Sequence, residues 1–277
     1  MENFLIIINA DKDKEFELTN QICDYLATLG KQCIRAAIDV KGHLLHNEIP
    51  KGVDCALVLG GDGTIIRAAR ELAELDIPIL GFNLGTLGYL AEVEVSDFKK
   101  ALNKLFLKRP AIEKRMMLQG CINGEMENSA LNDIVISRDG SLRIVNFNVY
   151  VNGILLNNYM ADGVVISTPT GSTAYNLSAG GPIVEPTASI IVLTPICSHA
   201  LNTSSIVLSA EDSIEVEVCT DRYGQPERMA VTFDGYEPVA MATGDRIVIR
   251  KSSQVTKLVK LREESFLKIM QTKMKGN

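Results

Sequence analysis

The stretch Gly60-Gly61-Asp62-Gly63-Thr64 decides the fold that this sequence predicts. An apolar run, residues 56–59, stands before it, and an amphipathic stretch, Ile65 to Leu75, follows it. This order predicts a buried strand, a glycine turn and a helix. Glycines let a ligand approach the backbone closely, and the N–H groups at a helix start form an anion site. A carboxylate there suits a metal that bridges phosphates, or a base that takes a proton from an attacking hydroxyl. We therefore hypothesise phosphoryl transfer.

The same five residues are also typical of a tight turn that binds no ligand. Turn chemistry alone favours glycine and aspartate, and Asp62 would then stand near the N-cap of the following helix. The rest of the chain has to decide between these two interpretations.

Composition restricts the function classes. The 277 residues suffice for one large domain or two ordinary ones. The 28 basic and 34 acidic residues give a net charge of −6, which argues against general nucleic-acid affinity and against a polybasic membrane anchor. No apolar run has membrane-spanning length, and the N-terminus lacks a signal-peptide pattern. We expect a cytoplasmic protein with neither a nucleic-acid partner nor a membrane partner.

The six cysteines are scattered along the chain, with no C-x-x-C pair and no neighbouring histidine. Their spacing favours small buried thiols in a reducing compartment over a zinc site or a disulfide framework.

Residues 1–110 alternate between strand signals and helix signals. Apolar runs predict strands at 4–8, 33–40, 56–59 and 79–80, and apolar stripes predict helices at 14–29, 65–75 and 96–106. Such alternation predicts a doubly wound parallel α/β domain, with its ligand crevice beyond the carboxyl ends of the strands. Both the 60–64 turn and the glycine-rich run Gly81–Leu90 fall at such ends.

From residue 111 the pattern changes to short alternating strands. Turn signals such as Asn152-Gly153 and Asp234-Gly235 separate them, which predicts an antiparallel β-sandwich-like or barrel-like domain over 111–254. An apolar-striped helix at 262–270, within the last stretch 255–277, is expected to pack back on the first domain.

Two stretches of the second region do not fit a plain strand. Residues 168–175, Thr-Pro-Thr-Gly-Ser-Thr-Ala-Tyr, offer hydroxyl and N–H groups to a polar ligand, and Tyr175 can flank a flat base. A β-turn with hydroxyl caps is the alternative. Asn132-Asp133 places an amide and a carboxylate in an apolar strand, where polar groups need partners. This pair either holds ribose hydroxyls or an adenine edge, or marks a bulge or a strand end at which it meets backbone groups. Asp234-Gly235 is first of all a type I′ hairpin turn.

The order of these motifs resembles that of the NAD kinase family of bacterial type. The resemblance covers about residues 55–250 and is carried by 60–64, Asn83–Gly88, Asn132-Asp133, 168–175 and Phe233–Gly235. Lipid kinases share Gly-Gly-Asp-Gly, whereas its combination with the 168–175 stretch is highly specific. The resemblance implies transfer of the γ-phosphoryl group of ATP, with a divalent cation such as Mg²⁺, to the 2′-hydroxyl of the adenosine ribose of NAD. The product would be NADP.

The roles that the resemblance implies follow the matching motifs. Asp62 would be the general base that takes the 2′-hydroxyl proton, and Tyr175 would stack on the adenosine. The phosphate loop would consist of Gly60, Gly61, Gly63 and Thr64. The residues assigned to NAD are Asp62, Gly63, Arg67, Asn132, Asp133, Arg143, Met160, Asp162, Thr170, Thr173, Ala174, Tyr175, Asn176, Leu177 and Ser178. Metal ligands are left open.

The chain departs from common members of the family at two positions. Met160 stands where a basic residue is frequent, and Tyr236 stands where a smaller polar residue is frequent. These departures put the local contacts and the choice between NAD and NADH in question. The resemblance also implies a homo-oligomer, a dimer or a tetramer, built through the second domain.

Two rival functions are weighed against this one. A lipid-alcohol kinase with the same glycine turn would expose a basic or apolar surface to a membrane, which the acidic composition does not indicate. A non-catalytic dinucleotide sensor would keep the pocket, although the intact Asp62 argues against it. ATP and polyphosphate both stay open as phosphoryl donors.

Overall fold

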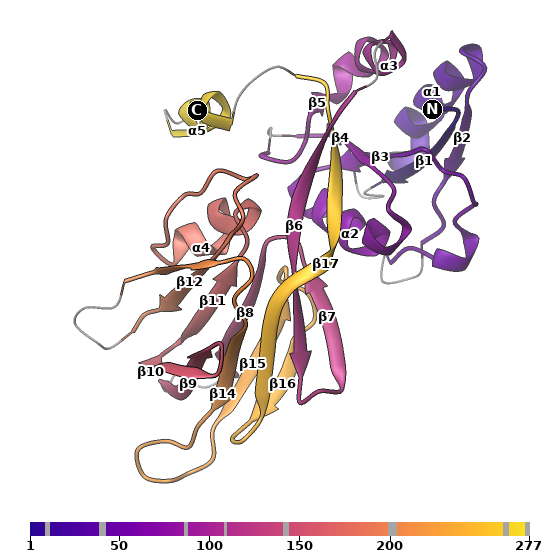
Figure 1. Cartoon of the computed structure of the whole chain (residues 1–277). Coiled ribbons are helices and arrows are strands. Elements are labelled where there is room, and N and C mark those ends of the chain that lie inside the picture. Colours follow the sequence, from indigo (N-terminus) through magenta and orange to yellow (C-terminus); the bar gives the residue numbers. More distant parts are fainter. Residues whose placement is uncertain are drawn as a thin grey trace. The chain divides into compact units, whose positions relative to one another are not determined.

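The computed structural model describes residues 1–8, 12–38, 43–85, 88–107, 110–140, 144–198, 204–262 and 266–274. The chain divides into two compact units (Figure 1). The first comprises Met1–Lys114 and Val255–Asn277, and the second comprises Arg115–Gln254. The division therefore falls after Lys114, whereas the sequence pattern placed a boundary after Pro110.

The first unit is built on a parallel sheet in the order β2-β1-β3-β4. Its strands are β1 Asn3–Ile8, β2 Gln32–Arg35, β3 Cys55–Gly60 and β4 Ile79–Asn83, with the short β5 Val93–Glu94 paired parallel to β4. Strands β1 and β3 are continuous apolar runs, as expected of strands covered on both faces. The parallel α/β domain is confirmed. Strand β2 is shorter than the predicted strand 33–40, whose last two residues lie outside the described part.

Helices cover both faces of this sheet. They are α1 Glu17–Thr28 and α3 Phe98–Leu107 on one face and α2 Asp62–Leu72 on the other. The unit also contains α5 Phe266–Met274 and the 3-10 turns η1 Lys14–Phe16, η2 His46–Glu48, η3 Ala73–Leu75 and η4 Val95–Asp97. Ile22 of α1 and Leu102 of α3 are buried in one apolar cluster with Phe4 of β1. On the other face, Gly81 of β4 makes room for α2, because a Cβ there would come 2.5 Å from Cδ1 of Ile65. A parallel sheet with helices on both of its faces is a doubly wound α/β arrangement.

Helix α5 contacts the segment around Tyr89. The Phe266 ring lies 6.4 Å from the Tyr89 ring, and the Lys273 ammonium lies 4.7 Å from the same ring. The helix begins at Phe266 and not at residue 262 as predicted, and residues 263–265 lie outside the described part.

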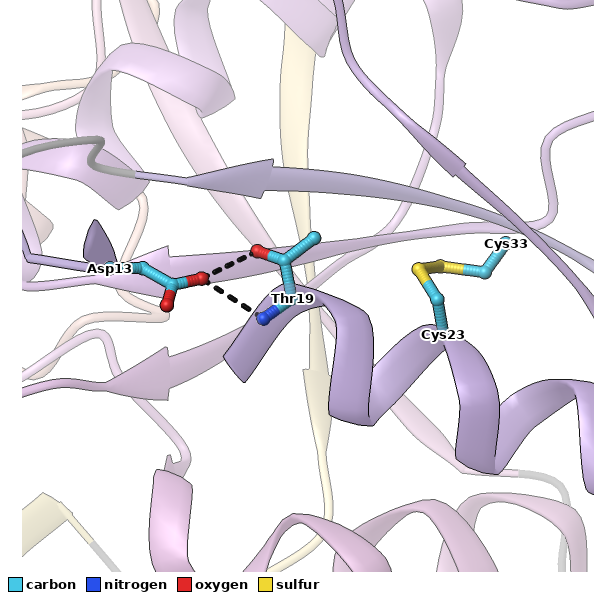
Figure 2. The surroundings of a disulfide bond; sticks show 4 residues. All are labelled: Asp13, Thr19, Cys23 and Cys33. Carbon is cyan, nitrogen blue, oxygen red and sulfur yellow. Dashed lines mark hydrogen bonds between the residues drawn. A yellow bond between two sulfur atoms is a disulfide. The ribbon is translucent and has the colours of Figure 1, made fainter. Parts of the chain in front are cut away.

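Figure 2 shows how α1 begins and how it is tied to β2. The buried carboxylate of Asp13 accepts hydrogen bonds from the N–H of Thr19 at 2.9 Å and from its hydroxyl at 2.8 Å. Such bonds satisfy donors that a helix start leaves open. Further along α1, Cys23 forms a disulfide with Cys33 of β2, with their Cα atoms 5.3 Å apart.

The expectation that all six cysteines are small buried thiols is therefore wrong. Cys23 and Cys33 meet because the chain turns back after α1 and places β2 beside it, a tertiary contact that no local spacing reveals. Among the free cysteines, Cys55 is buried but Cys197 is exposed.

The second unit contains a six-stranded antiparallel sheet in the order β13-β12-β11-β8-β15-β16. Its strands are β8 Asp133–Arg138, β11 Gly163–Ser167, β12 Ile190–Ile196, β13 Ile206–Ser209, β15 Arg228–Phe233 and β16 Val239–Ala242. Two short helical segments, η5 Thr170–Thr173 and α4 Tyr175–Ser178, follow β11. The hairpin β15–β16 turns at Asp234-Gly235, whose φ angles of 53° and 73° have the sign that a type I′ turn requires.

A second group of antiparallel strands packs on this sheet. It consists of β6 Ala111–Ile122, β7 Met126–Ala130, β9 Val145–Val151, β10 Ile154–Ala161, β14 Ile214–Val218 and β17 Arg246–Lys260. One buried cluster joins Phe147 and Val216 of this group to Ile134 and Val164 of the six-stranded sheet. The antiparallel second domain is confirmed.

Candidate active site

Asp62 is the first residue of α2, directly after the turn that leaves β3. Its half-buried carboxylate accepts two backbone hydrogen bonds, from the N–H of Tyr89 to Oδ2 at 2.8 Å and from the N–H of Leu90 to Oδ1 at 3.1 Å. One bond to each oxygen fixes the plane of the carboxylate and leaves each oxygen further acceptor capacity. The group can therefore accept a proton from a bound hydroxyl or bind a cation.

Glycines keep the space around this carboxylate open. A Cβ on Gly88 would overlap the carboxylate atoms of Asp62, so that a larger residue there would displace them. Gly60 gives the same room to the side chain of Thr64, whereas Gly61 and Gly63 face open space. The first N–H groups of a helix have no helical acceptor. Together with the glycines, the start of α2 can hold phosphate oxygens.

Arg67 and Arg143 are the two arginines assigned to NAD from the sequence. Arg67 is half-buried on α2, and within the described ranges no carboxylate forms an ion pair with it. Arg143 lies outside the described residues.

The second unit contains a pocket with a volume of about 380 Å³. Small-ligand sites have volumes of this order. Its lining residues are Asn132, Asp133, Val135, Ser137, Ala174, Tyr175, Thr232, Asp234 and Gly235. The pocket thus brings together the Asn132-Asp133 pair, the end of the 168–175 stretch and the Asp234-Gly235 turn, three motifs that are far apart in the sequence.

One face of the six-stranded sheet forms the floor of this pocket. Asp133, Val135 and Ser137 alternate along β8, and Thr232 of β15 pairs with Val135. The residues between them, such as Ile134, point into the core. Val135, Ser137 and Thr232 are lining residues that were not predicted from the sequence. Period-two alternation from Asp133 could have found Ser137, since alternate residues of a strand share a face.

The carboxylate of Asp234 holds the strand end before β8 in place. It accepts the N–H groups of Leu131 at 2.8 Å, Asn132 at 2.7 Å and Asp133 at 3.2 Å. Residues 131 and 132 therefore lie at a strand end, as the alternative interpretation of the Asn132-Asp133 pair expects. Strand β7 ends at Ala130 and β8 begins at Asp133, because Asp234 takes the N–H groups that a continuing ladder would use.

Asp133 is a buried carboxyl group with a perturbed pKa. Burial, together with the nearby carboxylate of Asp234, raises the pKa of Asp133 to about 7. Its side chain lines the pocket although the residue is only 4% exposed. Near neutral pH the group is consequently present both as an acid, which can donate a hydrogen bond, and as an acceptor-only carboxylate.

Most hydroxyls of the 168–175 stretch are used to shape the loop. Thr168 donates its hydroxyl to the carbonyl of Leu131 at 2.6 Å, and Ser172 donates to the carbonyl of Pro169 at 2.7 Å. Gly171 packs so closely on the backbone of Asn132 that a Cβ would overlap it. The β-turn alternative is thus partly right, since these hydroxyls cap backbone groups. They also dock the loop against the Asn132 strand end.

Two further predicted residues support the loop from behind. The hydroxyl of Thr170 accepts a hydrogen bond from the buried guanidinium of Arg115 at 3.2 Å. Asn176 is fully buried, and its amide donates to the carbonyls of Ser172 at 3.1 Å and Pro182 at 3.0 Å. These contacts fix the backbone that carries Ala174 and Tyr175 at the pocket.

The other predicted residues of the second unit lie outside the lining of the pocket. Tyr175, which does line it, is 45% exposed. Its neighbours Leu177 and Ser178 are exposed, and Thr173 is half-buried. Asp162 forms an ion pair with Arg138 at 3.0 Å. Met160 is 44% exposed on β10.

No cluster of three or more His, Cys, Asp or Glu side chains suited to a metal occurs among the described residues. Mg²⁺ is commonly held by one or two carboxylates together with water and ligand phosphates, and Asp62 offers one carboxylate of that kind. None of the helices in the described ranges is long and apolar enough to cross a membrane.

Two family models match the chain. The ATP-NAD kinase N-terminal domain matches residues 32–109, and the ATP-NAD kinase C-terminal domain matches residues 131–261.

Curated relatives match over nearly the whole length. The NAD kinase of Lachnoclostridium phytofermentans is 45% identical over 287 residues, covering 99% of both chains. The NAD kinase of Agathobacter rectalis is 47% identical over 284 residues, covering 100% of this chain and 99% of that protein.

Solved structures share the fold. The yeast NADH kinase complexed with NADH has a TM-score of 0.85 at 24% identity, over 100% of this chain and 88% of that one. An NAD kinase from Archaeoglobus fulgidus in complex with ATP has a TM-score of 0.79 at 26% identity, with 97% of each chain covered.

Proposed function

This chain belongs to the family of ATP-dependent NAD kinases, and from that premise we propose that it transfers the γ-phosphoryl group of ATP to the 2′-hydroxyl of the adenosine ribose of NAD. Asp62 acts as the general base in this reaction. The observation that carries the proposal is the carboxylate of Asp62 at the start of α2, oriented by the N–H groups of Tyr89 and Leu90.

Asp62 acts on a weak nucleophile. A ribose hydroxyl loses its proton only as its bond to phosphorus begins to form, and a carboxylate within hydrogen-bond reach can accept that proton. General-base catalysis of this kind typically contributes about 10²–10⁴-fold. The two N–H donors hold the carboxylate in one orientation before the substrate arrives. Each oxygen keeps acceptor capacity for the hydroxyl proton.

The polyphosphate of ATP has to be neutralised locally because the protein is acidic. Gly60, Gly61, Gly63 and Thr64 are proposed as the phosphate loop between β3 and α2. The N–H of Thr64 donates to the carbonyl of Gly61 at 3.0 Å, so the N–H groups of Gly61 and Gly63 are the ones proposed to meet phosphate oxygens. A divalent cation such as Mg²⁺ would supply further charge neutralisation of the transferring group, with Asp62 as the carboxylate near it. Arg67 of the same helix and Arg143 are proposed as additional phosphate contacts.

NAD is proposed to occupy the pocket of the second unit. Asn132 offers both amide donors and an acceptor, and Asp133 can donate or accept, which suits the mixed edges of a base or a ribose. The exposed ring of Tyr175 can stack on the adenosine. Ala174 lines the same pocket. Thr173, Leu177, Ser178, Met160 and Asp162 remain proposed NAD contacts. Thr170 and Asn176 hold the loop that carries Thr173, Leu177 and Ser178.

A cytoplasmic homo-oligomer completes the proposal. Strand β10 stands at the end of its sheet among the described strands and exposes Ile154, Leu155 and Leu156 by 74%, 53% and 38%. An apolar sheet edge of this kind is suited to pairing with another chain, so the second unit is the proposed site of association. Sedimentation of the wild type beside Ile154→Lys tests this, with a smaller assembly expected for the variant.

A coupled assay of NADP formation tests the proposed reaction. The protein is incubated with Mg²⁺ and either ATP or polyphosphate as donor, and with NAD, NADH or a diacylglycerol as acceptor. Formation of NADP from ATP and NAD supports the proposal. Phosphorylation of diacylglycerol alone would favour the lipid-kinase alternative, and nucleotide binding without any product would favour the sensor.

A further inference from the structure

Glu92 is a buried carboxylate that binds the end of the C-terminal strand. Its side chain is 4% exposed. One oxygen, Oε1, accepts the N–H groups of Leu261 at 2.9 Å and Arg262 at 2.5 Å, and the other, Oε2, pairs with the ammonium of Lys260 at 2.6 Å. Hydrogen bonds to an ionised group are roughly twice as strong as neutral ones. The end of β17 therefore holds Glu92 firmly.

The strand end is itself tied to the first unit. The ammonium of Lys104 on α3 donates to the carbonyl of Leu261, and Leu258 pairs with Ile79 of β4. Val259 and Leu261 belong to the buried cluster that α1 and α3 share with the parallel sheet. Glu92 is thus bound to a part of the chain that the core keeps in place.

The segment that carries Glu92 also orients Asp62. Its residues Tyr89 and Leu90 donate their N–H groups to the two oxygens of that carboxylate. Only the buried Ala91 separates Leu90 from Glu92, whose own N–H donates to the carbonyl of Gly81 at 2.9 Å. A displacement at Glu92 is therefore passed through very little backbone to the groups that hold Asp62.

We propose that Glu92 is a positioning residue for phosphoryl transfer. By binding the end of β17, it holds the segment 88–92 where Tyr89 and Leu90 orient the carboxylate of Asp62. The inference rests on the proposed role of Asp62 as general base. Removal of the Glu92 carboxylate leaves two N–H groups and one ammonium without this acceptor, so the segment shifts to find others. A misplacement of about 1 Å at a reacting group can cost about a hundredfold in rate.

Steady-state kinetics of the full chain with Mg²⁺, ATP and NAD test the proposal, together with thermal unfolding of each variant. Glu92→Ala is expected to lower kcat about tenfold or more while KM for NAD and ATP stays within about twofold, since binding groups are untouched. Glu92→Gln retains an oxygen for the two N–H groups but places an amide nitrogen beside Lys260. It is expected to lower kcat about threefold, less than Glu92→Ala does, with KM unchanged.

Asp54→Ala is the matched control. The Asp54 carboxylate accepts the N–H groups of Glu2 at 2.6 Å and Asn3 at 3.0 Å just before β3, at the strand end opposite to Asp62. Its loss should lower the unfolding temperature and leave kcat unchanged. A merely structural role of Glu92 would give the same result for Glu92→Ala, and that result would overturn the proposal.

Two further variants, Glu92→Gln and Asp62→Asn, allow the proposal to be tested even if Glu92→Ala does not fold. Should Glu92→Ala not fold, Glu92→Gln decides, because a kcat equal to that of the wild type contradicts the positioning role and a reduced kcat at unchanged KM supports it. Asp62→Asn is measured in parallel. Undiminished turnover of Asp62→Asn removes the base role on which the proposal rests, whereas loss in Asp62→Asn with wild-type kcat in both Glu92 variants refutes the positioning role alone.

Discussion

Asp62 and Asp234 are held by the same kind of contact but do different things. Each aspartate stands beside a glycine, Asp62 at the start of α2 and Asp234 in the turn after β15. The Asp62 carboxylate accepts the N–H groups of Tyr89 and Leu90, and the Asp234 carboxylate accepts those of residues 131–133. Asp234 closes a strand end, and its bonds build the wall of a pocket. Asp62 stands at a helix start with glycines around it that leave room for a ligand. In the proposed function Asp62 acts on the substrate, whereas Asp234 shapes the pocket that receives it.

Filling the space beside the Asp62 carboxylate should lower turnover more than substitutions at Asp234, Asp133 or Thr170 do. In Gly88→Ala the new methyl group overlaps the carboxylate and displaces it. We expect turnover to fall about a hundredfold with little change in NAD affinity, because a reacting group is moved while the pocket is intact. Steady-state kinetics and NAD titration measure both. Equal losses of turnover and affinity would show that Gly88 serves binding instead.

Removal of the Asp234 carboxylate should lower the stability of the fold. Asp234→Ala deprives three backbone N–H groups of their acceptor. We expect the free energy of unfolding to fall by about 3 kcal/mol, since each buried donor left unsatisfied costs about 1–3 kcal/mol and some find water. Chemical denaturation measures the change. A loss well below 1 kcal/mol would mean that residues 131–133 are held by other contacts.

The raised pKa of Asp133 should make the free energy of unfolding depend on pH. Its pKa is raised from 3.8 to about 7, mainly by burial and further by Asp234. The fold therefore favours the protonated form, and this contribution is full below about pH 4 and is lost as the pH rises toward 7. Asp133→Asn, which is neutral at every pH, should be more stable than the wild type by about 2–4 kcal/mol at pH 8. Near pH 4 the difference should vanish. Unfolding curves at both values measure it, and a pH-independent difference would argue against the raised pKa.

Thr170, which supports the loop that carries Ala174 and Tyr175, should give the smallest change in stability when it is substituted. Thr170→Val removes the hydroxyl that accepts from Arg115 and keeps the shape of the side chain. The loss should be about 1 kcal/mol in stability, the ordinary net value of one hydrogen bond or slightly more because the donor is charged. A weaker NAD affinity should accompany it if the loop positions Ala174 and Tyr175. The same substitution at an exposed threonine, Thr187→Val, serves as a control.

The sequence predicted the fold where local pattern decides it. Apolar runs such as Phe4–Ile8 and the glycine turn at 60–64 identified the parallel sheet, and alternation identified the second unit. Prediction from the sequence failed where a group far away in the chain decides the local structure, through hydrogen bonds or through a disulfide. The strand end at residues 131–132 depends on Asp234, and the disulfide of Cys23 depends on the return of the chain to β2.

Site prediction followed the same rule. Motif order found Asn132, Asp133 and Tyr175, which share one pocket. It did not find Thr232, because a residue of an alternating strand that belongs to no motif has no distinguishing local signal. Nor did it distinguish Asn176, whose amide faces inward, from its exposed neighbour Leu177. Hydrogen bonding within the folded loop separates these two, and composition does not.

Turnover and NAD binding of Asp62→Asn test the central claim most directly. The substitution keeps the shape of the side chain and an oxygen for one N–H group, and it removes the basic carboxylate. We predict that NAD binding by calorimetry is nearly unchanged while NADP formation slows by at least about a hundredfold. Retained turnover with the pH dependence of the wild type would contradict the account.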